Sequence, residues 1–116
     1  MNKIFFLIEH PIIKRDVTIL RDSKTDSETF RAALQRVSNI LAVELSKDFQ
    51  LTETDVETPL EKTKGAKLTH NVILVPVLRA GLGMVNGFLQ IIPEAKVGHI
   101  GLQRDEETLK PIEYYY

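Results

Sequence analysis

The sequence predicts an α/β protein built around a βαβ unit, and three features of its second half lead to this prediction. Residues 72–78 form a continuous apolar run, typical of a parallel strand buried on both faces. Apolar residues then recur at helical spacing over 82–92, and Pro93 ends that helix. Residues 96–102 form a second apolar stretch. A strand, a helix and a strand within so short a span indicate a right-handed unit with parallel strands.

Residues 1–50 are expected to form an arm followed by a helix. Residues 10–22 have no clean hydrophobic period, so we expect an extended or partly helical arm there. Thr25 and Glu28 have the spacing of a capping box, which marks the start of a helix. Apolar residues then repeat at three- and four-residue steps, which predicts a helix over 26–47 with one face on the core.

Residues 51–69 are expected to form a two-stranded ribbon. Acidic residues alternate with Thr and Val over 51–60, which predicts a half-exposed strand, and Lys64-Gly65 is a plausible turn. The acidic side chains are Glu53, Asp55 and Glu57, and the lysines expected opposite them are Lys62, Lys64 and Lys67. One interpretation is a metal site. A solvated face balanced by lysines is favoured, because side chains that alternate along a flat strand spread too far to converge on one ion.

Length, charge and composition limit the classes of protein that fit. The 116 residues allow at most one domain, and 43% of them are hydrophobic. A net charge of −1 gives no global reason to expect nucleic acid or a membrane as a partner. Without cysteine there is no disulfide, thiolate metal site or cysteine nucleophile. The apolar start, residues 4–8, is too short for a secretory signal, so we expect a mature, cytoplasmic chain.

The turn after the strand at 72–78 is the strongest candidate for a binding site. Arg79, Ala80 and Gly81 follow that strand directly. Ligands of open α/β sheets bind outside the carboxyl ends of the strands, where a guanidinium and glycine-freed backbone suit a phosphate. Arg104 follows the second apolar stretch, so both arginines are expected to face one crevice. For each, the alternative is a surface arginine paired with a nearby carboxylate.

No catalytic pair emerges from the remaining polar residues. His10, His70 and His99 have no metal-ligand spacing. His99 lies within an apolar stretch and is expected to be a hydrogen-bonded core residue rather than a base. The terminal tract Tyr114–Tyr116 could bind bases, but a strand of β-formers is favoured.

Six blocks of the sequence carry a resemblance to a known family. They are His10-Pro11, Thr18-Ile-Leu-Arg-Asp22, Glu57-Thr-Pro-Leu60, Val75-Pro-Val-Leu-Arg-Ala-Gly-Leu-Gly-Met84, Val97-Gly-His-Ile-Gly-Leu102 with Arg104-Asp105, and Tyr114-Tyr115. Together they closely resemble the amino-terminal half of uracil phosphoribosyltransferase. The Leu-Arg-Ala-Gly-Leu-Gly-Met and Gly-His-Ile-Gly blocks are specific to this enzyme among phosphoribosyltransferases.

The resemblance implies transfer of a phosphoribosyl group from phosphoribosyl pyrophosphate (PRPP) to N1 of uracil in pyrimidine salvage, which gives UMP and pyrophosphate with Mg²⁺. It implies that Arg79 and Arg104 contact PRPP, and that backbone at Ala80 and Gly81 faces the pyrophosphate. It also implies an open parallel sheet with flanking helices, and a homodimer formed through the ribbon at 51–69. No residue is assigned as catalytic or as a metal ligand.

Two departures from the family are small and one is large. Asn86 stands where the family often has Asp, and Gln103 where an aromatic or apolar residue is common. The large departure is length, because family members are roughly twice as long, and the second half carries the ribose 5-phosphate loop and the uracil-binding segment. Residues 1–116 are therefore expected to be a partial domain, with the βαβ core at 70–116. We also expect an unpaired sheet edge beside 96–102.

Two functions remain open on this basis. The first is a uracil phosphoribosyltransferase, of which this chain is the amino-terminal part and is inactive when isolated. The alternative is a non-catalytic interaction module that keeps the ribbon and half of the sheet.

Overall fold

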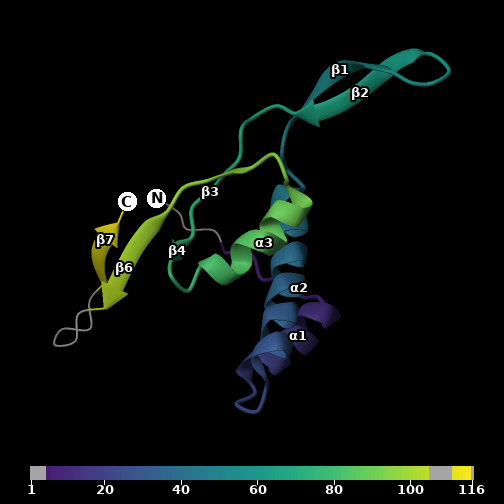
Figure 1. Ribbon diagram of the computed structural model, residues 1–116. Coiled ribbons are helices and arrows are strands. Elements are labelled where there is room, and N and C mark those ends of the chain that lie inside the picture. The colour runs from purple at the N-terminus through teal and green to yellow at the C-terminus, as the bar shows by residue number, and fades with distance from the viewer. Residues whose placement is uncertain (1–4, 105–110, 116) are drawn as a thin grey trace.

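The computed structural model describes the backbone of residues 5–104 and 111–115, and side chains over residues 5–99. Three helices gather in one body, the strands form small sheets beside it, and a ribbon projects away from both (Figure 1). This ribbon gives the molecule its elongated extents of 64 × 32 × 30 Å. The elements in chain order are α1 (Pro11–Arg21), α2 (Ser27–Ser46), β1 (Leu51–Glu57), β2 (Lys62–Leu68), β3 (Ile73–Leu74), β4 (Val77–Leu78), α3 (Leu82–Ile91), β5 (Lys96–Val97), β6 (Ile100–Arg104) and β7 (Pro111–Tyr115).

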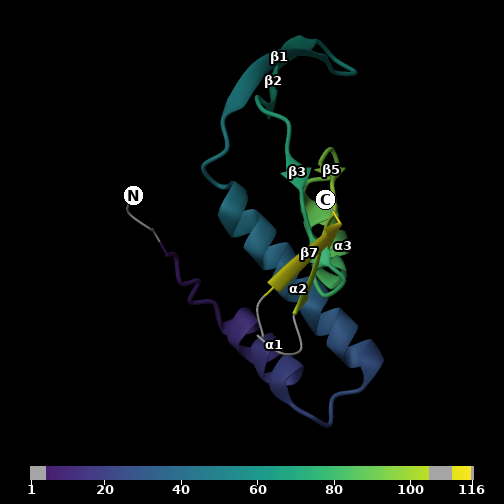
Figure 2. The same cartoon turned by 90° about the vertical axis from the view of Figure 1, so that its left-hand side faces the viewer.

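The βαβ unit predicted from the sequence is present with parallel strands. β3 pairs with β5, beside which Figure 2 shows α3, and β4 pairs with β6. α3 connects the two halves of the unit. The prediction of one continuous strand over 72–78 is wrong, because the strand is interrupted at Val75-Pro76. Proline has no N–H to donate to a sheet ladder, which accounts for this break. The second stretch is also interrupted, at Gly98-His99.

The prediction that residues 72–78 are buried on both faces is also wrong. Pro76 is buried and Leu74 is half-buried, but the side chains that alternate with them are exposed. Ile73 is 64% exposed, Val75 49% and Val77 44%. The described part of the chain therefore covers one face of this strand segment and leaves the other apolar face open.

The expected unpaired edge beside residues 96–102 is wrong for β6. β7 pairs with β6 in the antiparallel direction, which gives a sheet of order β4-β6-β7. This pairing confirms the prediction of a strand at Tyr114-Tyr115, whereas Tyr116 lies outside the described residues. Among the described residues, the outer side of β5 has no strand partner, so the prediction holds for residues 96–97, and the sides of β3 and β4 that face away from β5 and β6 have none either.

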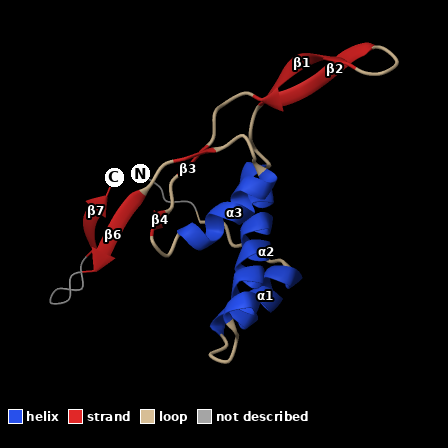
Figure 3. Cartoon of the chain, in the orientation of Figure 1, coloured by secondary structure: helices blue, strands red, loops and turns tan. Residues whose placement is uncertain are grey.

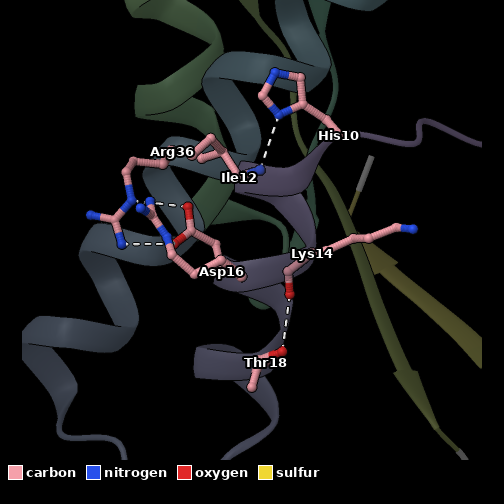
Figure 4. Close-up of polar contacts among 7 residues, drawn as sticks. His10, Ile12, Lys14, Asp16, Thr18 and Arg36 are labelled. Atoms are coloured by element: carbon pink, nitrogen blue, oxygen red, sulfur yellow. Dashed lines mark hydrogen bonds and ion pairs between the residues drawn. The ribbon is translucent and has the colours of Figure 1, made fainter.

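Residues 10–22, expected to be extended or partly helical, are helical over Pro11–Arg21. The N-terminus of the helix is stabilised because His10 Nδ1 accepts a hydrogen bond from the Ile12 N–H at 3.1 Å (Figure 4). Proline is also favourable at the first helical position. Ile13 and Asp16 are buried where α1 contacts α2. Burial of this face stabilises the helix, whose sequence is strongly amphipathic at helical spacing, a signal that the sequence analysis did not recognise.

The predicted helix over 26–47 is confirmed as Ser27–Ser46, but its cap differs from the prediction. Asp26, not Thr25, is the N-cap, and its carboxylate accepts the Thr29 N–H at 2.7 Å. The Thr25 hydroxyl donates instead to the Ile19 carbonyl at 2.6 Å, which ties the connection between the helices to the end of α1. The buried stripe of α2 is Ala33, Val37, Ser38 and Ala42.

The contact between α2 and α3 depends on small residues. A Cβ added at Gly87 would lie 2.4 Å from Ser38 Cβ and 2.9 Å from the Gln35 carbonyl oxygen. Asn39 Nδ2 bridges the same crossing, because it donates to the Gly87 carbonyl at 2.7 Å and to Gln90 Oε1 at 3.0 Å. Close approach at Gly87 thus fixes α3, and the turn that precedes it, on the surface of α2.

The ribbon predicted over 51–69 is confirmed, with β1 and β2 antiparallel. The predicted turn at Lys64-Gly65 is wrong, because both residues lie inside β2 and the reversal occurs at residues 58–61. There, Thr58 and Glu61 are joined through the Thr58 N–H at 2.8 Å and the Thr58 hydroxyl at 2.6 Å, both donating to the Glu61 carbonyl.

None of the helices in the described part of the chain has the length and apolar character needed to cross a membrane.

Candidate functional site

The strand-to-helix turn predicted at Arg79 is confirmed. β4 ends at Leu78, residues 79–81 form the turn, and α3 begins at Leu82. Two backbone bonds close the turn, from the Gly81 N–H to the Val77 carbonyl at 2.7 Å and from the Leu82 N–H to the Arg79 carbonyl at 3.0 Å. The Leu78–Arg79 peptide bond is cis. Arg79 and Ala80 are exposed at this turn, where a ligand can reach them.

Glycine at position 81 has a different role from the one expected. Its φ of −66° and ψ of −17° are ordinary right-handed values, so the turn does not need glycine for a left-handed conformation. A Cβ there would lie 2.7 Å from the Val77 nitrogen and 2.8 Å from the Val77 oxygen. Glycine is required because the turn folds back onto the backbone of β4. The Gly81 N–H donates to the Val77 carbonyl within the turn, and a contact of Gly81 with PRPP stays a prediction.

The backbone places Arg104 at the same end of the sheet as Arg79. β4 and β6 are parallel neighbours, with Leu78 opposite Gly101, and Arg104 is the last residue of β6. Both arginines therefore follow the pairing of Leu78 with Gly101 in the same direction. The side chain of Arg104 lies outside the described part of the structure, so a shared crevice stays a prediction.

An apolar hollow of about 330 Å³ lies beside the turn. Its lining residues are Leu74, Val75, Pro76 and Val77 from the strand segment, and Gly81, Met84, Val85 and Phe88 from the turn and α3. None of them is charged, so this hollow is unsuited to an anion and the polar chemistry belongs to the exposed side of the turn. A second hollow, of about 530 Å³, lies at the root of the ribbon, where His70 Nε2 and Gln50 Oε1 are 3.1 Å apart.

The histidines and the acidic triplet do not form a site in the described residues. His99 was expected to be hydrogen-bonded, and this is wrong for its Nδ1, which is buried without a partner. Glu53, Asp55 and Glu57 are exposed, and Asp55 pairs with Lys64 across the ribbon. The solvated-face interpretation is therefore confirmed. Lys67 was expected opposite the acidic face and lies on the other one, opposite Thr52.

An ion pair that the sequence analysis missed connects α1 to α2 (Figure 4). The Asp16 side chain is fully buried, and Arg36 donates to its two oxygens from Nε and Nη2, each at 2.9 Å. Arg15 adds a bond from Nε at 3.2 Å. Hydrogen bonding to Arg36 lowers the pKa of Asp16, and burial opposes this effect without reversing it. The pair joins α1 to α2.

The paired parallel strands, the crossover helix and the small sheets define an α/β protein, and its exposed arginine turn lies at a strand's carboxyl end, where open sheets of this class bind ligands. The family model described as uracil phosphoribosyltransferase matches residues 7–116. The chain belongs to the uracil phosphoribosyltransferase family.

Curated relatives and a solved structure agree with this assignment. A uracil phosphoribosyltransferase of Salinibacter ruber is 50% identical over 94% of this chain and 52% of its own length. One of Finegoldia magna is 51% identical over 99% of this chain and 55% of its own length. The structure of the AQ2163 protein from Aquifex aeolicus is similar with a TM-score of 0.88 and 38% identity, over 93% of this chain and 52% of that one. The chain spans about half the length of the relatives it matches.

Proposed function

We propose that this chain supplies the pyrophosphate side of a uracil phosphoribosyltransferase site, in which uracil and PRPP give UMP and pyrophosphate. The observation that carries the proposal is the exposed Arg79 turn at the carboxyl end of β4, in a chain that belongs to this family over residues 7–116. Arg79, Ala80, Gly81 and Arg104 are the proposed PRPP contacts, and Gly81 also keeps the turn close to β4.

The charge of the turn suits the proposed reaction. When pyrophosphate leaves the ribose carbon, negative charge develops on its oxygens, and fixed cations and backbone N–H groups stabilise that charge. The Arg79 guanidinium can hold two oxygens at once. Because the turn is tied to β4 through Val77 and to α2 through α3, Arg79 projects from a fixed base rather than from a free loop.

Mg²⁺ is proposed to enter as part of the PRPP substrate. Among the described residues, no group of three or more His, Asp or Glu side chains could hold a metal ion. The described residues around the Arg79 turn are cationic or apolar and do not fit a resident cation. Mg²⁺ commonly binds substrate phosphates and keeps several waters, so it can arrive on PRPP without a cage in this part of the chain.

Residues 1–116 contain no Thr-Gly-Gly sequence of the kind that cradles the ribose 5-phosphate in the family. Without that loop and a uracil pocket, the reacting atoms are not held in attack geometry, and such positioning can account for roughly 7–11 kcal/mol of a barrier. We expect this chain alone to bind PRPP weakly at best and to form no UMP.

We also propose a cytoplasmic protein that dimerises through the ribbon, with neither nucleic acid nor membrane as a partner.

The test measures PRPP binding and UMP formation separately. Calorimetry with Mg²⁺-PRPP is run on the chain, on Arg79→Ala and on Arg21→Ala, a control that removes another exposed arginine at the end of α1. Arg79→Ala should lose the binding and Arg21→Ala should keep it. Labelled uracil is then assayed beside the full-length Finegoldia magna relative. Turnover by the chain alone within tenfold of that relative would contradict our account of the missing contacts.

The alternative is a non-catalytic interaction module, and one observation favours it: the ribbon and the strand segment at 73–77 expose apolar side chains that could contact a partner. The two functions differ in one measurable property. A module without catalytic purpose should bind no PRPP, so equal and negligible PRPP binding by the chain and by Arg79→Ala would favour it.

A further inference from the structure

Among the described residues, Asn39 of α2 is the side chain whose hydrogen bonds join α2 to α3, the helix that follows the Arg79 turn. Its Nδ2 donates to the Gly87 carbonyl at 2.7 Å and to Gln90 Oε1 at 3.0 Å. Gly87 and Gln90 are neighbours on one side of α3, because side chains three positions apart share a helix face. A single amide group on α2 therefore holds α3 at two points along its axis.

The packing at the same crossing fixes how close the two helices lie but does little to stop one from sliding along the other. A Cβ added at Gly83 would lie 2.6 Å from Leu34 Cδ2, and one added at Gly87 would lie 2.4 Å from Ser38 Cβ. At both points α3 presents backbone where other helices present a side chain. Helices are normally held in register by ridges of side chains that fit into grooves of the neighbour, whereas a hydrogen bond depends on position and direction. The bonds of Asn39 are thus the contacts that resist a slide of α3 along α2.

A slide of α3 would reach the Arg79 turn directly. The Arg79 carbonyl accepts the N–H of Leu82, the first residue of α3, at 3.0 Å. On the other side of the turn, the Gly81 N–H donates to the Val77 carbonyl of β4 at 2.7 Å, and β4 is paired with β6. The turn is therefore held between a helix that Asn39 locates and a strand that the sheet locates. Any displacement of α3 relative to the sheet must be taken up by this turn.

We propose that Asn39 is a positioning residue for PRPP binding, which sets the place of the Arg79 turn through α3 and does not itself touch the substrate. The inference rests on the proposed function, because it assigns Asn39 a role at the turn proposed to bind PRPP. It adds to that function a residue of α2, far from Arg79 in the chain. Loss of the Asn39 bonds should weaken PRPP binding, whereas a loss of stability elsewhere in the helices should not.

The test variants are Asn39→Asp, which keeps the shape of the side chain but has no N–H to donate, and Asn39→Ala, which removes the amide without adding charge. Gln90→Ala is a milder variant, because Gln90 is exposed and the bond to the Gly87 carbonyl remains. The matched control is Asp16→Asn, which weakens the ion pair on α2 and leaves the bonds to α3 in place.

Binding of Mg²⁺-PRPP is measured by NMR titration of the full 116-residue chain, followed at the Ala80 amide, because this method detects weak binding. The Kd should rise about three- to tenfold in both Asn39 variants, the range that the net loss of one hydrogen bond gives. It should rise by about twofold in Gln90→Ala and stay unchanged in Asp16→Asn.

Hydrogen exchange without ligand tests the position of the turn separately, under conditions in which circular dichroism shows each variant folded. The amides of Gly81 and Leu82 should exchange about three- to tenfold faster in the Asn39 variants and at the original rate in Asp16→Asn. The proposal is overturned if the Asn39 variants keep the original PRPP affinity or the original exchange rates, or if Asp16→Asn changes both measures as much as they do. If the unchanged chain binds no Mg²⁺-PRPP, the proposed function fails, and the exchange rates alone decide whether Asn39 holds the turn.

Discussion

Substitution of Gly87 by alanine tests whether the crossing of α2 and α3 depends on backbone approach. The new Cβ would stand 2.4 Å from Ser38 Cβ and 2.9 Å from the Gln35 carbonyl oxygen, whereas carbon atoms normally pack at about 3.5–4.0 Å. Both obstacles belong to α2, close to or within its backbone. The helices must therefore move apart, and the bond from Asn39 Nδ2 to the Gly87 carbonyl, now 2.7 Å, should lengthen or break.

The magnitude follows from three effects. Overpacking of a well-packed contact costs about 1–3 kcal/mol, and loss of the Asn39 bond costs roughly 0.5–1.5 kcal/mol. Alanine has a helix propensity about 1 kcal/mol better than glycine, which offsets part of this cost. We expect a net loss of about 2 kcal/mol, which lowers the Tm of a domain of this size by roughly 10 °C.

The assay is thermal unfolding followed by far-UV circular dichroism, with two glycine controls. At Gly98, the atom of the described residues nearest to an added Cβ would be Val75 Cγ2 at 3.9 Å, so Gly98→Ala should change the Tm little. At Gly83 the obstacle at 2.6 Å is Leu34 Cδ2, the end of a flexible side chain, so Gly83→Ala should cost less than Gly87→Ala. A Gly87→Ala variant that melts at or above the unchanged chain would refute the close-packing argument.

Three further predictions follow from other parts of the molecule. Gly81→Ala should lower the Tm and weaken PRPP binding more than Gly98→Ala, because its Cβ would lie 2.7 Å from the Val77 backbone nitrogen; equal Tm values would contradict this. Because the pKa of Asp16 is lowered in the folded chain, its pairing stabilises the fold above the unfolded pKa of about 3.9 and this stability is lost as the pH falls through the folded pKa. Asp16→Asn should thus be less stable at neutral pH and lose less stability on acidification, as measured by urea unfolding across pH; parallel profiles would count against it. Deletion of residues 51–69 should change the mass in solution, measured by light scattering, from that of a dimer to that of a monomer of the shortened chain. An unchanged number of chains per particle would argue against a dimer through the ribbon.

The sequence determined the elements that depend on local pattern. The helix at Ser27–Ser46, the ribbon, the parallel βαβ unit and the turn at Arg79 all follow from hydrophobic period and chain order, and Figure 3 shows them in those places. The family, too, could be identified from short blocks of residues. These features were accessible because each is set by residues close together in the chain.

Tertiary structure decided the features that depend on distant partners. The packing of α1 on α2 buries Ile13 and Asp16, and Arg36, 20 positions further along the chain, binds the Asp16 carboxylate. No local period signals such a pairing. The ribbon turn lies at 58–61 rather than at 64–65, where Thr58 bonds to Glu61, and this places Asp55 opposite Lys64.

The candidate site divides in the same way. The sequence alone determined that Arg79 follows a strand and precedes a helix, because the apolar run ends there. Only the fold showed that Gly81 is needed for close approach to Val77, that its N–H is already bonded, and that the face of Ile73 and Val75 is open. An apolar run indicates that burial of its side chains is favourable, but the residues that bury them come from other segments of the chain. The described residues bury only one face of the strand segment at 73–78.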